Sequence, residues 1–296
     1  MPDEQKTQLK NQILLCVQNE PNKGVRRKVA DLAAEVARNL TDDDGNNLWP
    51  EFLKFLFDCA SSTNPEIKEC ALHMFSSIPT VFGNQEAQYV DVIKQMLQSS
   101  LTDQSYEVRF TAVKASGNYL LLHDEDSGLQ KHFADLLGPI MQVTVQSVEK
   151  QDDEACLKSL IDIAEAMPKY LRPQLEQIFQ LCLKMIENEE LGESWRHLAL
   201  ELIVTTAETA PAMVRKVVGS CVGLVVQACL KMMTDLEDED DWEFGANAGG
   251  CVAATLVLAP WKAGVLTDVI TAAGLKATGI EGEADGATAD EGSCKE

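Results

Sequence analysis

The amino-acid sequence predicts an all-α protein in which pairs of helices stack into an elongated solenoid. Three observations lead to this prediction. The 296-residue chain is 45% hydrophobic, which is enough for a folded core. Its glycine count is low, at 18, its aromatic content is 6%, and it lacks the β-branched, turn-rich pattern of a β-sandwich. A helix, a short polar turn and a second helix recur along the whole chain. The second helices also begin with a common motif at a nearly constant spacing.

This motif is an apolar residue, a charged or polar stretch, and a small or apolar residue four positions later. Its copies begin at Val25, Ile67, Val108, Cys156 and Trp195, which are 42, 41, 48 and 39 residues apart. A helix pair of about 40–47 residues is the period of HEAT and armadillo arrays. One pair cannot bury its apolar face alone, so consecutive pairs must stack to form the core. We therefore expect a HEAT-repeat (armadillo-like), right-handed α-solenoid of about five to six helix pairs.

The apolar pattern also gives the helix boundaries. The first helices are expected at 4–18, 48–61, 85–101, 129–149, 174–187 and 212–234. Their partners are expected at 25–40, 66–81, 106–122, 154–170, 193–210 and 248–258. Side-chain oxygens able to cap free amide groups precede the second helices at Asn22, Asn64, Asp103 and Asp152. The predicted organisation is a repeat array over 1–244, a weakly specified helical segment over 245–275 and a disordered acidic tail over 276–296.

The charge balance bears on the kind of partner. The chain has 47 acidic and 25 basic residues, a net charge of −22 at pH 7. This excess argues against a nucleic-acid binder, because phosphate binding depends on Lys and Arg, and it favours a basic partner. Six of the seven residues in Asp235–Asp241 are carboxylates. This acidic loop is either a solvated segment that maintains solubility or an electrostatic contact for a basic partner.

The sequence carries no signature of catalysis, metal binding or membrane insertion. The sequence has no phosphate-binding glycine loop, zinc-protease helix or nucleophile elbow, and its four histidines are isolated from one another. The nine cysteines include no C-x-x-C pair, and most occupy apolar helical positions, which is typical of free thiols in a reducing compartment. The longest weakly polar run, 217–230, is shorter than the ~20 residues that span a bilayer. We expect a protein that is not an enzyme, with no cofactor, no metal site and no membrane insertion.

Several long stretches of the sequence match one known protein family in a constant order. They include VADLAAEVARNL at 29–40 and DGNNLWPE at 44–51, and they continue at 82–85, 89–94, 131–137, 168–173, 198–205 and 233–242. These stretches resemble the importin-beta superfamily of nuclear transport receptors, in particular its importin-5 (karyopherin beta-3) branch, and the resemblance covers about residues 1–244. It implies a nuclear import receptor that binds basic cargo such as ribosomal proteins and histones. Such receptors cross the pore on FG nucleoporins, release cargo to Ran-GTP, and shuttle between cytoplasm and nucleus with a transient stay at the nuclear envelope.

Family members are several times longer than this chain, and the likeness fades after Phe244. The resemblance therefore implies an early-middle slice of a receptor, from a truncated or divergent paralogue or an imperfect gene model. Because the first repeats of the family hold much of its Ran-GTP site, Ran-GTP is expected to bind weakly if at all. The periodicity is equally compatible with an alternative function, a HEAT-repeat scaffold or regulatory subunit without transport activity.

Two groups of candidate binding residues follow. In the family that the sequence resembles, the acidic loop reaches toward cargo or Ran. The resemblance therefore gives these candidate contact residues in the loop: Asp235, Glu237, Asp238, Glu239, Asp240, Asp241 and Trp242. It also places the second helices on the concave surface of the superhelix. Helical periodicity gives their polar faces, which form a concave stripe of Asp31, Glu35, Asn39, Glu69, Asn118, Asp162, Glu165, Glu201 and Glu208, with His73 and Lys114 beside them. Any single member could equally be an ordinary solvated residue.

Overall fold

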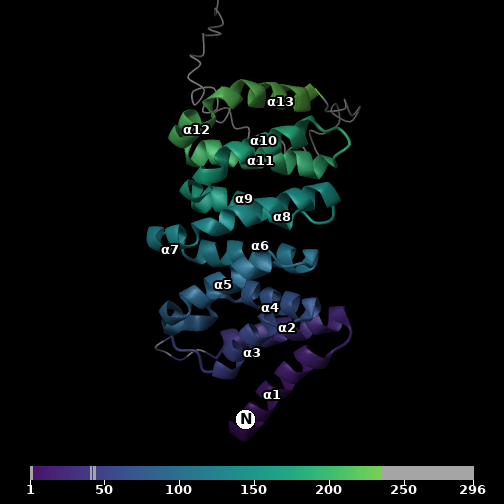
Figure 1. The fold of residues 1–296 in the computed structure, drawn as a ribbon, viewed down its shortest axis with the longest axis vertical. Helices are drawn as coiled ribbons and strands as arrows, with labels where there is room; N and C mark the ends of the chain where they lie inside the picture. Colours follow the sequence, from purple (N-terminus) through teal and green to yellow (C-terminus); the bar gives the residue numbers. More distant parts are fainter. Residues whose placement is uncertain (1–2, 41, 43–44, 235–296) are drawn as a thin grey trace, which may run out of the picture.

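The computed structural model describes residues 3–40, 42 and 45–234 of the chain. These residues form a stack of antiparallel helix pairs along one long axis, with no β-strand in the described part (Figure 1). The prediction of an all-α solenoid is therefore confirmed. The acidic loop at 235–241, the expected helix at 248–258, the segment 245–275 and the tail 276–296 lie outside the described residues.

The described residues contain five complete pairs. They are α1 (Asp3–Asn19) with α2 (Lys23–Arg38), α3 (Pro50–Ala60) with α4 (Pro65–Ser77), α5 (Val90–Leu101) with α6 (Tyr106–Leu122), α8 (Leu137–Lys150) with α9 (Ala155–Ala166), and α10 (Leu175–Glu187) with α11 (Glu193–Thr209). Short elements connect them, namely η1 (Pro79–Gln88), α7 (Ser127–His132), η2 (Ala134–Leu136) and η3 (Pro168–Gln174). The described part ends with α12 (Pro211–Val218), η4 (Gly219–Cys221) and α13 (Val222–Thr234).

Several expected helices are shorter or broken, and proline and glycine explain most of the differences. The helices expected to run to 81 and 170 end at Ser77 and Ala166, just before Pro79 and Pro168, because a proline ring excludes the helical conformation of the preceding residue. The expected helix 129–149 is interrupted by η2, and α8 carries Pro139 in its first turn, where a missing N–H costs little. The expected helices 85–101 and 212–234 are likewise replaced by η1 with α5, and by α12, η4 and α13.

The caps of the second helices follow the prediction in two of four cases. Asn22 Oδ1 accepts from the Gly24 and Val25 amides, and Asn64 Oδ1 accepts from the Glu66 amide at 3.0 Å. Asp103 Oδ1 accepts at 2.9 Å from the amide of Ser105, which is the residue before α6, so it caps no amide of that helix. The prediction for Asp152 was also wrong. Asp153 Oδ1 accepts from the Ala155 amide at 2.9 Å, while Asp152 accepts from the Tyr106 hydroxyl of the preceding unit at 3.1 Å. Two adjacent aspartates before one helix cannot be ranked from sequence.

The second helices form the inner wall of the stack. α2, α4, α6, α9 and α11 pack directly on one another in this order, whereas successive first helices touch each other much less. The closer packing places the second helices on the inner side of the curvature. A continuous apolar core fills the space between the two walls, and it includes Trp49 and Trp195 as buried anchors. Five described cysteines, Cys59, Cys70, Cys156, Cys182 and Cys229, are buried free thiols.

No single helix among the described residues is both long and apolar enough to cross a bilayer. One bent pair, Pro211–Cys221 with Gly223–Met232, passes that test on length and composition, with 83° between its two parts. Val218, Val225 and Ala228 of this pair are buried inside the protein.

Candidate binding surface on the second helices

The five second helices present one motif position in a line along the inner wall. Counted from the first residue of the motif, the seventh residue is Asp31, His73, Lys114, Asp162 and Glu201 in successive units. All but the half-buried His73 are exposed. Because the helices carrying them stack directly, these side chains lie on neighbouring ribs of the same surface. The structure thus brings the core of the predicted stripe together, and we call this row the inner line.

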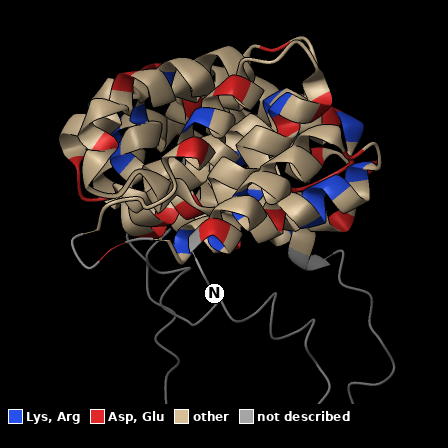
Figure 2. Cartoon of the chain, turned by 90° about the horizontal axis from the view of Figure 1, so that it is seen from below, with Lys and Arg blue, Asp and Glu red and all other residues tan. Residues whose placement is uncertain are grey.

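In the first two units, the charges of the inner line are paired within the protein. The Asp31 carboxylate lies 2.7 Å from His73 Nε2, which joins α2 to α4. Glu35 contacts Arg38 at 2.6 Å and accepts from Asn39 Nδ2 at 3.0 Å. The Glu35–Arg38 pair offsets part of the acidic character that the sequence indicated for this end. Figure 2, which views the stack from its N-terminal end, shows acidic and basic residues interleaved over the helices.

Glu69 departs from its predicted role. Its side chain is only 3% exposed and lies against Lys23 and Arg27 of α2, with Lys23 Nζ 3.3 Å away. The carboxylate therefore joins the first two units and is not part of the exposed surface. Asn118 is exposed, but its Nδ2 donates to the Ser76 carbonyl at 2.8 Å and ties α6 to the end of α4. Periodicity alone does not separate a charge facing a neighbouring helix from one facing water.

In the last two units the inner line is acidic. We call the exposed carboxylates Asp162 and Glu165 of α9 and Glu201 and Glu208 of α11 the acidic patch. No salt bridge links any of the four to another described residue. Partial burial and the neighbouring Glu165 carboxylate raise the pKa of Asp162. Lys158 lies one turn before Asp162 on α9, and its pKa is raised mainly by its hydrogen bond to Glu154 and also by the charge of Glu201. The patch therefore has a negative field that is only partly balanced.

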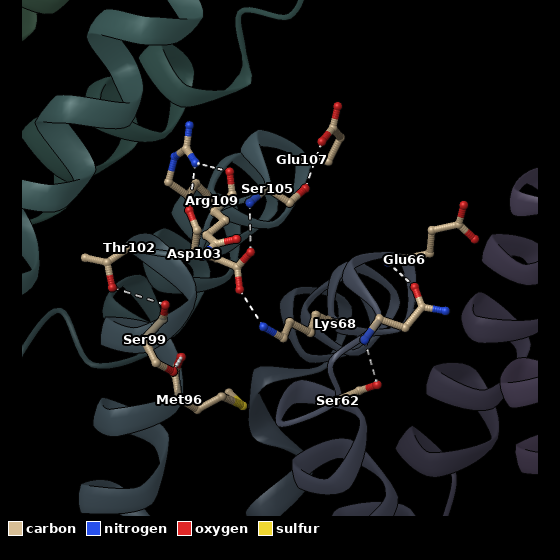
Figure 3. A network of polar contacts seen from close by, with 12 residues as sticks. Ser62, Glu66, Lys68, Met96, Ser99, Thr102, Asp103, Ser105, Glu107 and Arg109 are labelled. Atoms are coloured by element: carbon tan, nitrogen blue, oxygen red, sulfur yellow. Dashed lines mark hydrogen bonds and ion pairs between the residues drawn. The ribbon is translucent and has the colours of Figure 1, made fainter.

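A second network, missed at the sequence level, fixes the spacing of the units (Figure 3). Arg109 Nη1 donates to the carbonyls of Asp103 and Gln104 at 2.7 and 2.9 Å, and its Nη2 donates to Gln146 at 2.8 Å. Lys68 Nζ bonds the Asp103 carboxylate of the next unit at 2.5 Å. Burial alone would raise the pKa of Asp103, but the hydrogen bonds from Lys68 and the Ser105 amide outweigh it and hold this pKa below its ordinary value.

The same basic position recurs in other units. Arg26 Nε donates to the Glu20 carbonyl at 2.9 Å and its Nη1 to Glu66 at 2.7 Å, while Arg196 Nε donates to the Ile186 carbonyl at 3.1 Å. In each case an arginine at the second motif position joins its own helix to the end of the preceding first helix or to the turn that follows it. The repeated Arg or Lys after the first motif residue was the signal for this role. This network aligns the second helices and thereby positions the inner line.

Each histidine lies near a carboxylate: His73 by Asp31, His123 by Glu86, His132 by Asp91 and His197 by Glu193. Within the part of the chain that the structure describes, no group of three or more His, Cys, Asp or Glu side chains could hold a metal ion. The acidic-loop candidates Asp235, Glu237, Asp238, Glu239, Asp240, Asp241 and Trp242 lie outside the described residues.

Comparison with known protein families agrees with this architecture. A family model described as IPO5-like, TPR repeats matches residues 21–181, and a model of an importin repeat matches residues 188–249. The chain is 28% identical over 241 residues to importin subunit beta-3 of Saccharomyces cerevisiae, covering 79% of this chain and 21% of that protein. It is 22% identical over 238 residues to a probable importin-5 homolog of Dictyostelium discoideum, covering 79% of this chain and 22% of that protein. The chain thus spans about a fifth of the length of these relatives.

Solved structures of one karyopherin resemble the fold. Kap121p bound to the extreme C-terminus of the protein phosphatase Cdc14p superposes with a TM-score of 0.70 at 25% sequence identity, covering 92% of this chain and 26% of that one. Kap121p bound to Ste12p gives a TM-score of 0.68 at 25% identity, covering 91% and 26%. The likeness extends over nearly all of the stack.

Proposed function

The chain belongs to the importin family of nuclear transport receptors, in its IPO5-like group, and from this premise we propose that it binds Lys- and Arg-rich cargo proteins for import into the nucleus. The observation that carries the proposal is the acidic patch. Four exposed carboxylates on the inner wall, without salt-bridge partners among the described residues, form a surface that attracts a basic segment. The net charge of −22 adds a long-range field of the same sign.

The patch should act mainly on recognition and association. Clustered exposed carboxylates raise the local concentration of a basic partner and favour one orientation of docking, while each exposed ion pair adds little affinity by itself. A short basic segment lying across α9 and α11 would meet carboxylates on both helices. The phosphatase C-terminus seen on Kap121p supports a terminal segment as one form of cargo. Ribosomal proteins and histones have the required charge.

Further steps of the proposal concern transport. In an importin these are binding to FG nucleoporins, shuttling between cytoplasm and nucleus with a transient stay at the pore, and release of cargo to Ran-GTP. We expect Ran-GTP to bind this chain weakly if at all. The acidic loop, in particular Asp238 to Asp241 in its second half, is proposed as a second contact for basic cargo beside the acidic patch.

The test measures association of a Lys/Arg-rich peptide with the full chain at low and physiological salt. The patch variant carries Asp162→Asn, Glu165→Gln, Glu201→Gln and Glu208→Gln. A matched control removes four exposed carboxylates away from the inner line, through Asp58→Asn, Glu125→Gln, Glu176→Gln and Glu187→Gln. The patch variant should associate roughly three- to tenfold more slowly than the control at low salt, and the difference should shrink as salt screens the charges. Equal rates for the two variants would contradict the role of the patch.

A pull-down of basic proteins with and without GTP-loaded Ran completes the test. Binding of basic cargo that Ran-GTP barely affects is the expected result. Tight Ran-GTP binding would contradict the expected weakness of that interaction. Failure to bind any basic cargo, together with failure to bind FG repeats, would favour the scaffold without transport activity.

A further inference from the structure

Lys114 of α6 places a positive charge on the inner line, one rib before the acidic patch. Its side chain is exposed and forms no salt bridge with another residue that the structure describes. Burial is the main cause that raises the pKa of the Cys156 thiol in the first turn of α9, and the charge of Lys114 acts against it. Lys114 therefore lies beside the start of α9.

The carboxylates at the start of α9 do not pair with this cation, because each of them is engaged by another group. The partners are the Tyr106 hydroxyl for Asp152 at 3.1 Å, the Ala155 amide for Asp153 at 2.9 Å, and the Lys158 ammonium for Glu154 at 2.8 Å. On the other side of α6, Asp31 and His73 lie 2.7 Å apart and pair with each other. Lys114 is thus a free positive charge between the paired part of the inner line and the acidic patch.

We propose, on the basis of the function proposed above, that Lys114 binds the C-terminal carboxylate of a cargo protein whose basic residues lie on the acidic patch. Charge complementarity selects this occupant, because cations followed by one anion match carboxylates followed by one lysine. A chain terminus fits better than an internal segment, since the inner line beyond Lys114 offers the paired Asp31 and His73 instead of free carboxylates. The terminal carboxylate accepts a charge-assisted hydrogen bond and has no side chain that must be ordered.

The spacing of the helices sets the spacing of the basic residues in the cargo. The Thr209 hydroxyl donates to the Ala164 carbonyl at 2.9 Å, so the neighbouring Glu208 and Glu165 lie across from each other on α11 and α9. Packed helix axes are about 8–10 Å apart, and an extended segment with three residues per turn advances about 3.1 Å per residue. Two cations three residues apart therefore face the same way and meet one carboxylate on each helix.

The position of the carboxylate in the cargo follows from the same reasoning. Gly117 of α6 packs against Ser159 of α9, which sets Lys114 level with Cys156. Asp162 lies six residues farther along α9, about 9 Å at a rise of about 1.5 Å per residue. The step from one rib to the next brings the distance from Lys114 to Asp162 to about 13 Å, or about four residues of the segment. The expected ligand has Lys or Arg about four and seven residues before its C-terminal residue.

Fluorescence anisotropy with the full chain at low salt tests the proposal. The probe is an N-terminally labelled peptide with Lys at these two positions, prepared with either a free C-terminal carboxylate or a C-terminal amide. The free acid should bind about two- to fivefold more tightly, which is the range of one exposed ion pair. The net charge of −22 alone would favour the amide, because the amide lacks one negative charge. An amide that binds as tightly as the free acid would overturn the proposal.

Variants of Lys114 assign the preference to this residue. Lys114→Met should abolish the preference for the free acid, and Lys114→Glu should reverse it. Lys184→Met is the matched control and should retain the preference, since Lys184 is exposed on the outer helix α10 and its loss changes the net charge equally. Each variant is scored by the ratio of two affinities, so an unfolded fraction lowers both alike and leaves the ratio unchanged. A preference that survives in Lys114→Met would contradict the proposed site.

Two further peptides separate the chain terminus from other carboxylates. An amidated peptide with Asp as its last residue, and a free acid lengthened by four neutral residues after the second Lys, should both bind like the amide. Equal binding of the Asp peptide and the original free acid would overturn the specificity for a terminus. If no basic peptide binds, or if the patch variant binds them all as the unmodified chain does, the proposed function fails and this inference fails with it. Loss of the free-acid preference alone overturns only the role of Lys114.

Discussion

The junction between the first two units should be more sensitive to loss of its cations than to loss of its carboxylate. Glu69 is 3% exposed at its side chain, whereas Lys23 and Arg27, which contact it, are 48% and 47% exposed. Removing both cations leaves a buried carboxylate without partners, which costs about 3–5 kcal/mol. Removing the carboxylate leaves two cations that can turn into water, so only the pair and its hydrogen bonds are lost, at about 1–2 kcal/mol.

The comparison uses Lys23→Met/Arg27→Met against Glu69→Gln, since these changes keep most of the side-chain volume. In a solenoid each unit contacts only its neighbours, so the loss should appear as opening of α1 and α2 before the rest. Hydrogen exchange of the amides in these two helices measures it directly. Lys158→Met is a control, because the Lys158 side chain is more than half exposed and its partner Glu154 is not buried as Glu69 is. Equal or greater opening in Glu69→Gln would refute the reasoning.

Three further outcomes are expected. Thiol labelling followed by peptide mapping should modify the exposed Cys16 long before the buried Cys59, Cys70, Cys156 and Cys182. Burial raises the pKa of these four thiols to about 12, so few of them are present as the reactive thiolate. Labelling of the four at a rate comparable to that of Cys16 in the folded protein would contradict this. Gly83→Ala should destabilise the protein by about 1–3 kcal/mol in urea unfolding, because φ of Gly83 is +50° and an added Cβ would lie 2.0 Å from the Gly45 carbonyl oxygen. Gly138→Ala is the control, because a Cβ at Gly138 meets no atom within 4 Å. Folding raises the pKa of Asp162 above its unfolded-state value of 3.8. The contribution of Asp162 to stability is therefore largest at low pH and is lost as the pH rises from the unfolded-state pKa through the folded-state pKa. Asp162→Asn should raise the melting temperature at pH 7 and leave it unchanged near pH 3.

The starts of the second helices could be predicted from sequence more accurately than those of the first helices. The start of Tyr106–Leu122 and that of Glu193–Thr209 were predicted to the residue, whereas the second helices expected to end at 81 and 170 end four residues earlier. The motif combines a basic residue with an apolar register, and a polar turn precedes it, so several local signals agree on one start. The first helices begin in turns built from tertiary contacts, such as the approach of Gly83 to the Gly45 carbonyl across 38 residues. Such an approach leaves only an isolated glycine in the sequence.

The sequence predicts that the candidate residues form a row, but it does not predict which of their charges are paired within the folded protein. Asp31, Asp162 and Glu201 occupy one motif position, and periodicity places them on one side of the second helices. Whether each carboxylate is available to a binding partner depends on a residue about 40 positions away in the sequence, as with His73 for Asp31. The same distance separates Glu69 from Lys23 and Arg27, which turn it into a structural residue. Pair distances of this kind follow from stacking and are not contained in any local pattern.

Binding and stability are carried by different positions of the same repeat. Several contacts that join units use the second motif position, as with Arg26 and Arg109, and lie near the start of a second helix. The acidic patch uses positions farther along α9 and α11, where Asp162 and Glu165 repel each other. Neutralising the patch should therefore preserve or slightly increase stability while it slows association of basic cargo. A loss of binding in a variant that melts at or above the temperature of the unmodified chain is then evidence for electrostatic recognition, because partial unfolding would have lowered both.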